Sequence, residues 1–113
     1  MSSLLVVLTK PPYGREDALG AAYTALACAE KGISSTLLLV GDGVYAAMRG
    51  QRPQGPSIED LLYASYPDVK LLVDRKSMEE RGIRRDELVE HAKVADQKEI
   101  AKAVMEASWV LVF

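Results

Sequence analysis

The amino-acid sequence predicts an α/β protein in which a mostly parallel five-stranded sheet lies between two layers of helices. Apolar segments of strand length alternate with helical segments along the chain, and this alternation is typical of right-handed β-α-β crossovers. The run at residues 4–8 is apolar at every position, as expected for a strand buried on both faces of a parallel sheet. The chain has 113 residues, of which 49% are hydrophobic. It can therefore bury the core of a single domain, residues 1–113, without disulfides or metal ions.

Glycine and proline residues divide the first half of the chain into its elements. After the first strand, Pro11, Pro12 and Gly14 predict a loop. An alanine-rich segment follows, with acidic residues in its first turn and Gly32 after its last turn, which predicts a helix. The elements expected here are a strand at 4–8, a helix at 16–31, a strand at 35–40, a tight turn at 41–43, a short helix at 44–49 and a loop at 51–56.

Capping residues and further breakers define the second half. Ser57 and Asp96 are good N-cap residues for the helices that follow them. Pro67 ends the first of these helices, and Gly82 ends a shorter one. The elements expected here are a helix at 58–66, a strand at 69–73, a short helix at 77–81, a helical turn at 85–90, a strand at 92–95, a helix at 98–107 and a fully apolar last strand at 109–113.

Composition and charge exclude several classes of function. The net charge is −2 and the sequence contains no basic block, so direct nucleic-acid binding has little electrostatic support. No apolar run reaches about 18 residues, so we expect no membrane span. The N-terminal segment lacks the basic region and cleavage site of a signal peptide, so we expect a cytoplasmic protein. One cysteine and one histidine exclude an intramolecular disulfide, a multi-cysteine zinc site and a pair of histidine ligands; we expect no cofactor.

Polar residues follow three of the expected strands. Because ligands bind outside the carboxyl ends of the strands in open parallel sheets, these loops predict a shallow shared pocket. Its members would be Tyr13, Gly14, Asp42, Gly43, Asp74, Arg75 and Ser77. The alternative is ordinary solvated loop chemistry. Ser77 has no evident catalytic triad, since His91 is the only histidine and no nearby residue orients it.

Gly41, Gly43 and Ala46 fit a G-x-G-x-x-A pattern between a strand and a helix, with Glu59 and Asp60 further on. Such glycines let backbone amides approach a pyrophosphate. The alternative is a turn that needs glycine for its backbone conformation. Asp42 would add a negative charge beside the phosphates, and the pattern follows the second strand instead of the first, so the turn is favoured.

Cys28 and His91 are the remaining reactive side chains. A reactive thiol needs a helix N-terminus or a neighbouring cation, whereas Cys28 lies among alanines near the end of the first helix, where the helix dipole disfavours a thiolate. A small core residue is the favoured interpretation. His91 beside Glu90 could bind a metal ion, but a surface position is favoured.

Taken together, these segments resemble the DsrE/DsrF/DsrH-like family of small sulfur-relay proteins, nearly from end to end. The Asp-Gly-Val turn followed by Gly-Gln-x-Pro looks most like the DsrF/TusC branch. The segments that carry the resemblance are Pro11-Pro12-Tyr13-Gly14, Arg15-Glu16-Asp17-Ala18, Gly41-Asp42-Gly43-Val44-Tyr45, Gly50-Gln51-Arg52-Pro53, Arg81-Gly82 and Trp109-Val110-Leu111-Val112-Phe113.

The resemblance implies an α/β/α fold and assembly into trimers or hexamers, either as a homo-oligomer or with DsrE-like and DsrH-like partners. In such families a catalytic subunit passes persulfide sulfur through a cysteine near the third strand, toward tRNA thiolation or sulfur oxidation. In many relatives the positions matching Asp74 and Ser77 are cysteines, and neither residue supplies the sulfur nucleophile that a persulfide carrier needs. The resemblance therefore implies a non-catalytic subunit that scaffolds a cysteine-bearing partner.

Two alternatives stay open beside this hypothesis. One is a stand-alone homo-oligomer that binds a small molecule or nucleotide through the loop at Tyr13 and the turn at Gly41 and Gly43. The other is a sulfur carrier that uses Cys28. An edge strand at the end of the chain could pair with a partner, and Met48, Tyr63 and Tyr66 are either interface anchors or core residues.

Overall fold

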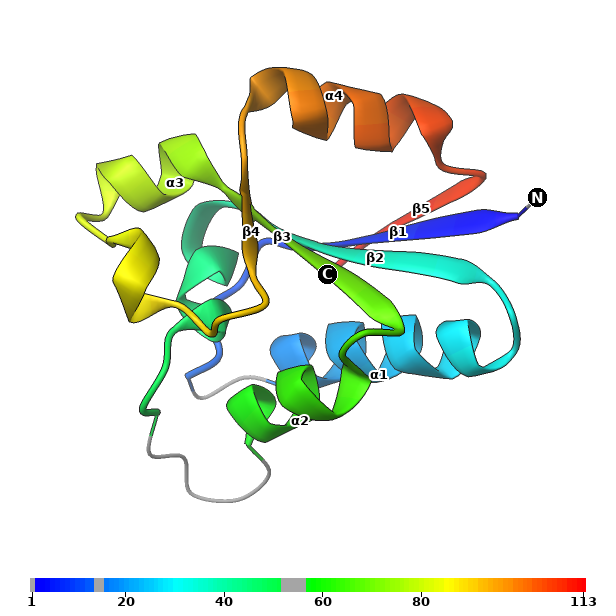
Figure 1. Ribbon diagram of the computed structural model, residues 1–113, viewed down its shortest axis with the longest axis horizontal. Helices are drawn as coiled ribbons and strands as arrows, with labels where there is room; N and C mark the ends of the chain where they lie inside the picture. Colours follow the sequence, from blue (N-terminus) through cyan, green and yellow to red (C-terminus); the bar gives the residue numbers. More distant parts are fainter. Residues whose placement is uncertain (1, 14–15, 52–56) are drawn as a thin grey trace.

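A parallel sheet with strand order β4-β3-β2-β1-β5 forms the centre of the protein (Figure 1). The computed structural model describes residues 2–13, 16–51 and 57–113. Within these residues the strands are Ser3–Leu8 (β1), Ser34–Leu39 (β2), Val69–Asp74 (β3), Lys93–Ala95 (β4) and Trp109–Val112 (β5). All four neighbouring pairs are parallel. The predicted three-layer α/β fold is confirmed, and the five predicted strands are present.

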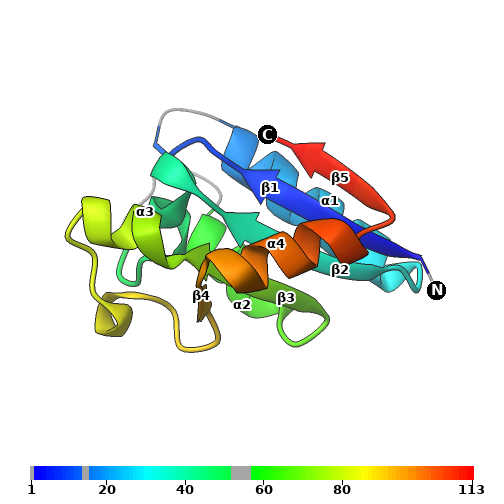
Figure 2. The same ribbon diagram turned by 90° about the horizontal axis from the view of Figure 1, so that it is seen from above.

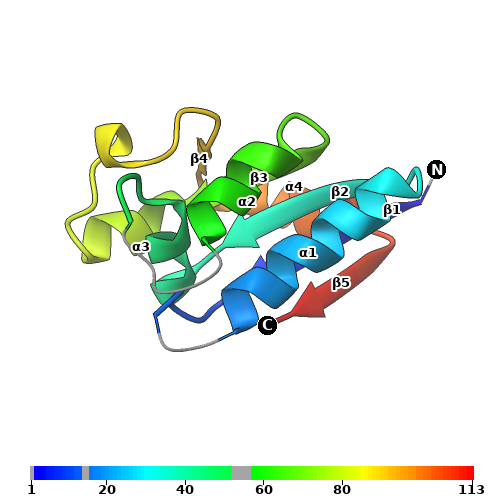
Figure 3. The same cartoon turned by 90° about the horizontal axis from the view of Figure 1, so that it is seen from below.

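Helices cover both faces of the sheet. Figure 3 shows α1 (Asp17–Glu30) and α2 (Ile58–Ser65) on one face, and Figure 2 shows α4 (Gln97–Glu106) on the other. The short α3 (Arg75–Glu80) leaves the carboxyl end of β3. Each helix among the described residues is too short or too polar to cross a membrane.

The structure corrects the predicted tight turn and short helix after the second strand. A single 3-10 helix, η1 (Gly41–Ala47), replaces both. Gly41 adopts a φ of +55°, so the chain turns directly at the end of β2. The predicted helical turn at 85–90 is likewise only a short 3-10 helix, η2 (Arg85–Glu87). The third helix begins two residues earlier than predicted because Asp74 caps it.

The two faces of the sheet bury different amounts of apolar side chain. Alternate strand residues point toward α1 and α2 and form the larger core, in which the buried alanines of α1 let the helix approach the sheet closely. The opposite face has a small core of Leu5, Leu38, Leu72 and Ala95, covered by Ile100 and Ala103 of α4 and their neighbours. The first face therefore provides most of the hydrophobic stabilisation, at about 1.5–3 kcal/mol for each large buried side chain.

The last strand lies at the edge of the sheet and is exposed. Every residue of β5 is exposed, although all four are apolar, and β5 pairs with β1 alone. The chain continues beyond β5 with the same ladder, since the Phe113 amide donates to the Val7 carbonyl at 2.8 Å. The sheet thus ends in an apolar edge.

Gly43 should be the glycine that this fold tolerates losing least. A Cβ atom at Gly43 would lie 2.1 Å from the backbone oxygen of Leu8, whereas one at Gly20 would meet only the Phe113 ring at an ordinary 3.5 Å. We expect Gly43→Ala to lower the free energy of unfolding by about 1–3 kcal/mol or more. Gly20→Ala, near the start of α1, should be neutral or stabilising by up to about 1 kcal/mol. Urea unfolding of both variants measures this, and equal effects would contradict the packing.

Candidate functional site

A buried carboxylate and a buried hydroxyl lie where β3 meets α3. Asp74 is the last residue of β3 and the N-cap of α3, and Ser77 follows in the first turn. One oxygen of Asp74, Oδ2, accepts hydrogen bonds from the Ser77 amide at 3.2 Å and from its Oγ at 2.5 Å. The two residues are only 8% and 5% exposed. Burial of a carboxylate is tolerated here because these donors replace water.

The Ser77 hydroxyl also joins α3 to the loop that follows β2. Its oxygen accepts a hydrogen bond from the Gly41 amide at 2.8 Å. On the other side of Asp74, the Gln97 side-chain amide lies 3.4 Å from Oδ1. Asp74 and Ser77 therefore connect the ends of β2 and β3 with the first turn of α4.

Arg81 completes this group, which we call the strand-end cluster (Asp42, Asp74, Ser77, Arg81, Gln97). Its Nε and Nη2 atoms each lie 3.0 Å from Oδ1 of Asp42. Its Nη1 donates to the Ser77 carbonyl at 3.1 Å. The Arg81 side chain is 22% exposed, against 56% for Asp42, so the guanidinium lies partly inside the protein.

Sequence reasoning missed Arg81 and Gln97. The charged run at Glu79, Glu80 and Arg81 reads as an exposed helix face, and Arg81 does lie 3.6 Å from Glu80. The available signal was the spacing of four residues between Ser77 and Arg81, which places both on one side of a helical turn. Gln97 gave no signal, because its contact with Asp74 depends on how α4 crosses the sheet.

The backbone geometry of the turn explains why glycine occupies positions 41 and 43. Gly41 has a positive φ, and Gly43 lies against the backbone of Leu8. The Gly41 amide is bonded to Ser77, and the Gly43 amide donates to the Val40 carbonyl at 2.9 Å. Both amides thus have acceptors within the protein, and Asp42 already pairs with Arg81. These contacts account for the glycine pattern without a bound phosphate.

The other predicted pocket residues lie apart from the cluster. Tyr13 is 61% exposed and contacts the Tyr45 ring at a centroid distance of 6.4 Å. Arg75 is exposed, with no hydrogen bond or ion pair to another described residue. Gly14 lies outside the described residues. The structure therefore brings together Asp42, Gly43, Asp74 and Ser77 of the predicted pocket.

Cys28 lies at the other end of the molecule. It is partly buried against the larger core, near the C-terminus of α1. Its carbonyl accepts from the amides of Lys31 at 3.1 Å and Ile33 at 3.0 Å, which close the helix. Since α1 returns the chain from the end of β1 to the start of β2, Cys28 lies near the amino ends of the strands, and the strand-end cluster lies at their carboxyl ends.

His91 lies between two tyrosine rings. The ring centroids of Tyr63 and Tyr66 lie 5.5 and 4.9 Å from that of His91, and Tyr63 donates to Oε2 of Glu90 at 2.9 Å. Burial lowers the pKa of His91, so the neutral imidazole is favoured. The hydrogen bond between Tyr63 and Glu90 lowers the pKa of Glu90 and raises the pKa of Tyr63.

This aromatic group does not resemble a metal site. Among the described residues, no group of three or more histidine, cysteine, aspartate or glutamate side chains is placed to hold a metal ion. Tyr63 and Tyr66 are exposed surface residues, whereas Met48 packs against the larger core.

Comparison with known proteins identifies the family. The model of the DsrE/DsrF-like family matches residues 2–113. The chain belongs to this family. It is 34% identical over 88 residues to the intracellular sulfur oxidation protein DsrF of Allochromatium vinosum, covering 74% of this chain and 65% of that protein. It is 25% identical over 118 residues to a TusC homolog of Vibrio parahaemolyticus, covering both chains fully. The predicted DsrF/TusC resemblance is confirmed.

The fold of this family member has a close structural counterpart. The crystal structure of the YchN protein from Escherichia coli superposes with a TM-score of 0.89 at 28% sequence identity, covering the full length of both chains. The parallel sheet and its helices are therefore the fold of this family.

Ser77→Ala should be costly because it removes two buried hydrogen bonds at once. Asp74 would lose its strongest donor, and the Gly41 amide would lose its acceptor. We expect the free energy of unfolding to fall by about 2–3 kcal/mol. Ser65→Ala is the matched control: Ser65 is equally buried, but its hydroxyl makes one hydrogen bond, to the Leu62 carbonyl. That variant should lose about 1 kcal/mol. Equal losses of unfolding free energy in urea would count against this double role of Ser77.

Acidification should destabilise the fold through His91. Its pKa is lowered in the folded state, so its contribution is complete above the unfolded value of about 6.5 and is lost as the pH falls through the folded pKa. We expect the wild type to lose more unfolding free energy between pH 7.5 and pH 5.5 than His91→Gln, measured by urea titration. Because the chain has one histidine, the difference reports this site. An equal loss in the variant would disprove the assignment.

Proposed function

We propose that this chain is a non-catalytic, DsrF/TusC-like subunit of a sulfur-relay assembly, in which it scaffolds a cysteine-bearing partner. The observation that carries the proposal is the apolar C-terminal surface, defined by the exposed residues Val104, Met105, Trp109, Val110, Leu111 and Val112. Because the DsrF relative is named for intracellular sulfur oxidation, we infer that the assembly acts inside the cell.

The C-terminal surface has the chemistry of a subunit interface. Met105 is 84% exposed, Val112 67% and Trp109 53%. Exposed apolar side chains follow one another closely along the end of α4 and along β5; large exposed apolar areas mark interaction surfaces, and aromatic and methionine side chains are enriched at interfaces. The surface also includes the edge strand β5, whose outer backbone groups are available to a further strand.

The strand-end cluster supports the non-catalytic part of the proposal. Where the family resemblance places a sulfur-carrying cysteine, this chain has Asp74 and Ser77, both buried and bonded to each other. Its single cysteine, Cys28, lies near the opposite, amino ends of the strands and packs against the core. A relay through this assembly would therefore use a thiol of another subunit.

Native mass spectrometry tests the proposal. The chain is mixed with the DsrE-like and DsrH-like proteins encoded in the same genome, and we expect a stable mixed complex. Met105→Glu should abolish it, because the variant buries an unpaired charge in the interface. Tyr66→Glu is the matched control, since Tyr66 is 58% exposed but lies at the end of α2 just before β3, which β2 and β1 separate from β5. No mixed complex, or a complex that survives Met105→Glu, would refute the proposal; a homo-oligomer that ignores those proteins would favour a stand-alone binding protein.

A further inference from the structure

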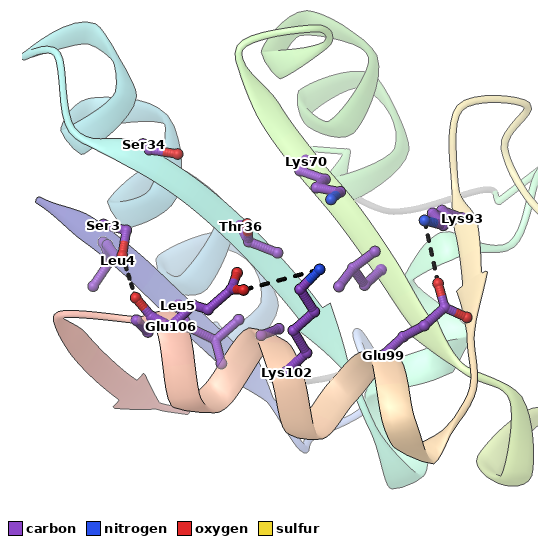
Figure 4. Close-up of a pocket in the computed structure, with 13 residues that line it drawn as sticks. Ser3, Leu4, Leu5, Ser34, Thr36, Lys70, Lys93, Glu99, Lys102 and Glu106 are labelled. Atoms are coloured by element: carbon purple, nitrogen blue, oxygen red, sulfur yellow. Dashed lines mark hydrogen bonds and ion pairs between the residues drawn. The ribbon is translucent and has the colours of Figure 1, made fainter. Parts of the chain in front are cut away.

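A pocket of about 350 Å³ lies between α4 and the sheet, above the first halves of the strands. Figure 4 shows it lined by strand side chains on one side and by Glu99, Lys102 and Glu106 of α4 on the other. We call it the α4 pocket. It is separate from the strand-end cluster, which lies at the opposite ends of the same strands.

On the face of the sheet beneath the α4 pocket, β2 and β3 begin with polar residues, which apolar residues follow. On β2, Ser34 and Thr36 precede the buried Leu38 on the same face, and on β3 Lys70 precedes Leu72 in the same way. The strand register places Thr36 directly beside Lys70. Ser34 and Lys70 are exposed and Thr36 is half-buried, so α4 leaves this part of the sheet face open to solvent and to a ligand.

Two of the three lysines at the pocket already have partners. Lys93 pairs with Glu99 at 3.2 Å, and Lys102 pairs with Glu106 at 4.0 Å. Lys70 makes no ion pair with the described residues, and the Thr36 hydroxyl makes no hydrogen bond to them. Figure 4 shows Lys70 and Thr36 on adjacent strands at the pocket. The exposed Lys70 and the half-buried Thr36 thus occupy neighbouring register positions, and neither side chain has a polar partner among the described residues.

We propose that the α4 pocket binds a small monocarboxylate with an apolar body. Lys70 Nζ and Thr36 Oγ1 would hold the carboxylate through a charge-assisted hydrogen bond and a neutral one. Leu5, Leu72 and Ala103 line the same pocket and would contact the apolar body. The volume falls within the range of about 300–1,000 Å³ that small-molecule sites occupy.

The charges of the pocket select a single negative charge. Three lysines face two glutamates, which leaves one uncompensated positive charge, on Lys70. Because Glu99 and Glu106 are paired with lysines, one carboxylate matches the remaining positive charge, and a second negative charge on the ligand would have no partner there. A neutral ligand of the same shape would leave Lys70 unpaired and gain only the apolar contacts.

Amide NMR titration of the whole chain with sodium hexanoate, at constant ionic strength, tests this site. We expect saturable shifts centred on Thr36, Lys70 and Ala103. The dissociation constant should rise at least about fivefold in Lys70→Met and about threefold in Thr36→Val, which keeps the side-chain shape. Lys76→Met, the same change at an exposed residue of α3, should leave binding unchanged. Hexanol and inorganic phosphate should each bind at least about tenfold more weakly than hexanoate.

Three results would overturn the proposal. They are no saturable shift with hexanoate, shifts centred on Trp109 and Val112 instead of the pocket, and equal binding by Lys70→Met and Lys76→Met. If Lys70→Met does not give a folded spectrum, Lys70→Gln replaces it with the same expected loss. Because β5 and the mixed complex are not involved in this readout, the outcome is independent of the proposed sulfur-relay role.

Discussion

The carboxylate of Asp74 is the group on which the carboxyl end of the sheet depends. A buried charge is tolerated only when hydrogen bonds replace its water, and here they come from two different helices, α3 and α4. Ser77 supplies two from α3, Gln97 supplies one from α4, and the Ser77 oxygen in turn holds the Gly41 amide of η1. One carboxylate therefore fixes the relative positions of the segments that follow β2, β3 and β4.

The two ends of the sheet differ in how their polar groups are used. At the carboxyl end, the cluster residues satisfy one another, with Arg81 held by Asp42 and the Ser77 carbonyl. At the amino end, polar residues of β2 and β3 lie beneath α4, and Lys70 has no counter-charge among the described residues. At the carboxyl ends of the strands, where ligands bind in most open parallel sheets, the polar side chains are thus bonded to one another. At the amino ends, Thr36 and Lys70 have no polar partner among the described residues. This distribution supports the proposed non-catalytic role of the strand-end cluster.

Sequence pattern could predict most of the elements and the cluster residues Asp42, Asp74 and Ser77, because these depend on local rules. Asp74 and Ser77 follow an apolar strand, so the strand-end rule identified them. Arg81 pairs with Asp42 across 39 residues of chain, and no local pattern specifies that partner. Thr36 and Lys70 become neighbours only once the order β3-β2-β1 is known. The exposure of β5 could not be predicted either, since a buried strand and an interface strand have the same apolar sequence.

The bond between Ser77 and Asp74 also bears on how this chain can evolve. Ser77→Cys would replace one atom, but the new sulfur would lie against a carboxylate, which disfavours the thiolate that sulfur chemistry requires. A usable thiol would need a second change that removes the Asp74 charge, and that change alone takes the acceptor away from Ser77 and Gln97. Each single step is unfavourable, so under the proposed non-catalytic role a nucleophile could arise at this position only through two linked changes. A hydrogen bond that stabilises the fold would in this way also restrict the chemistry that the position can acquire.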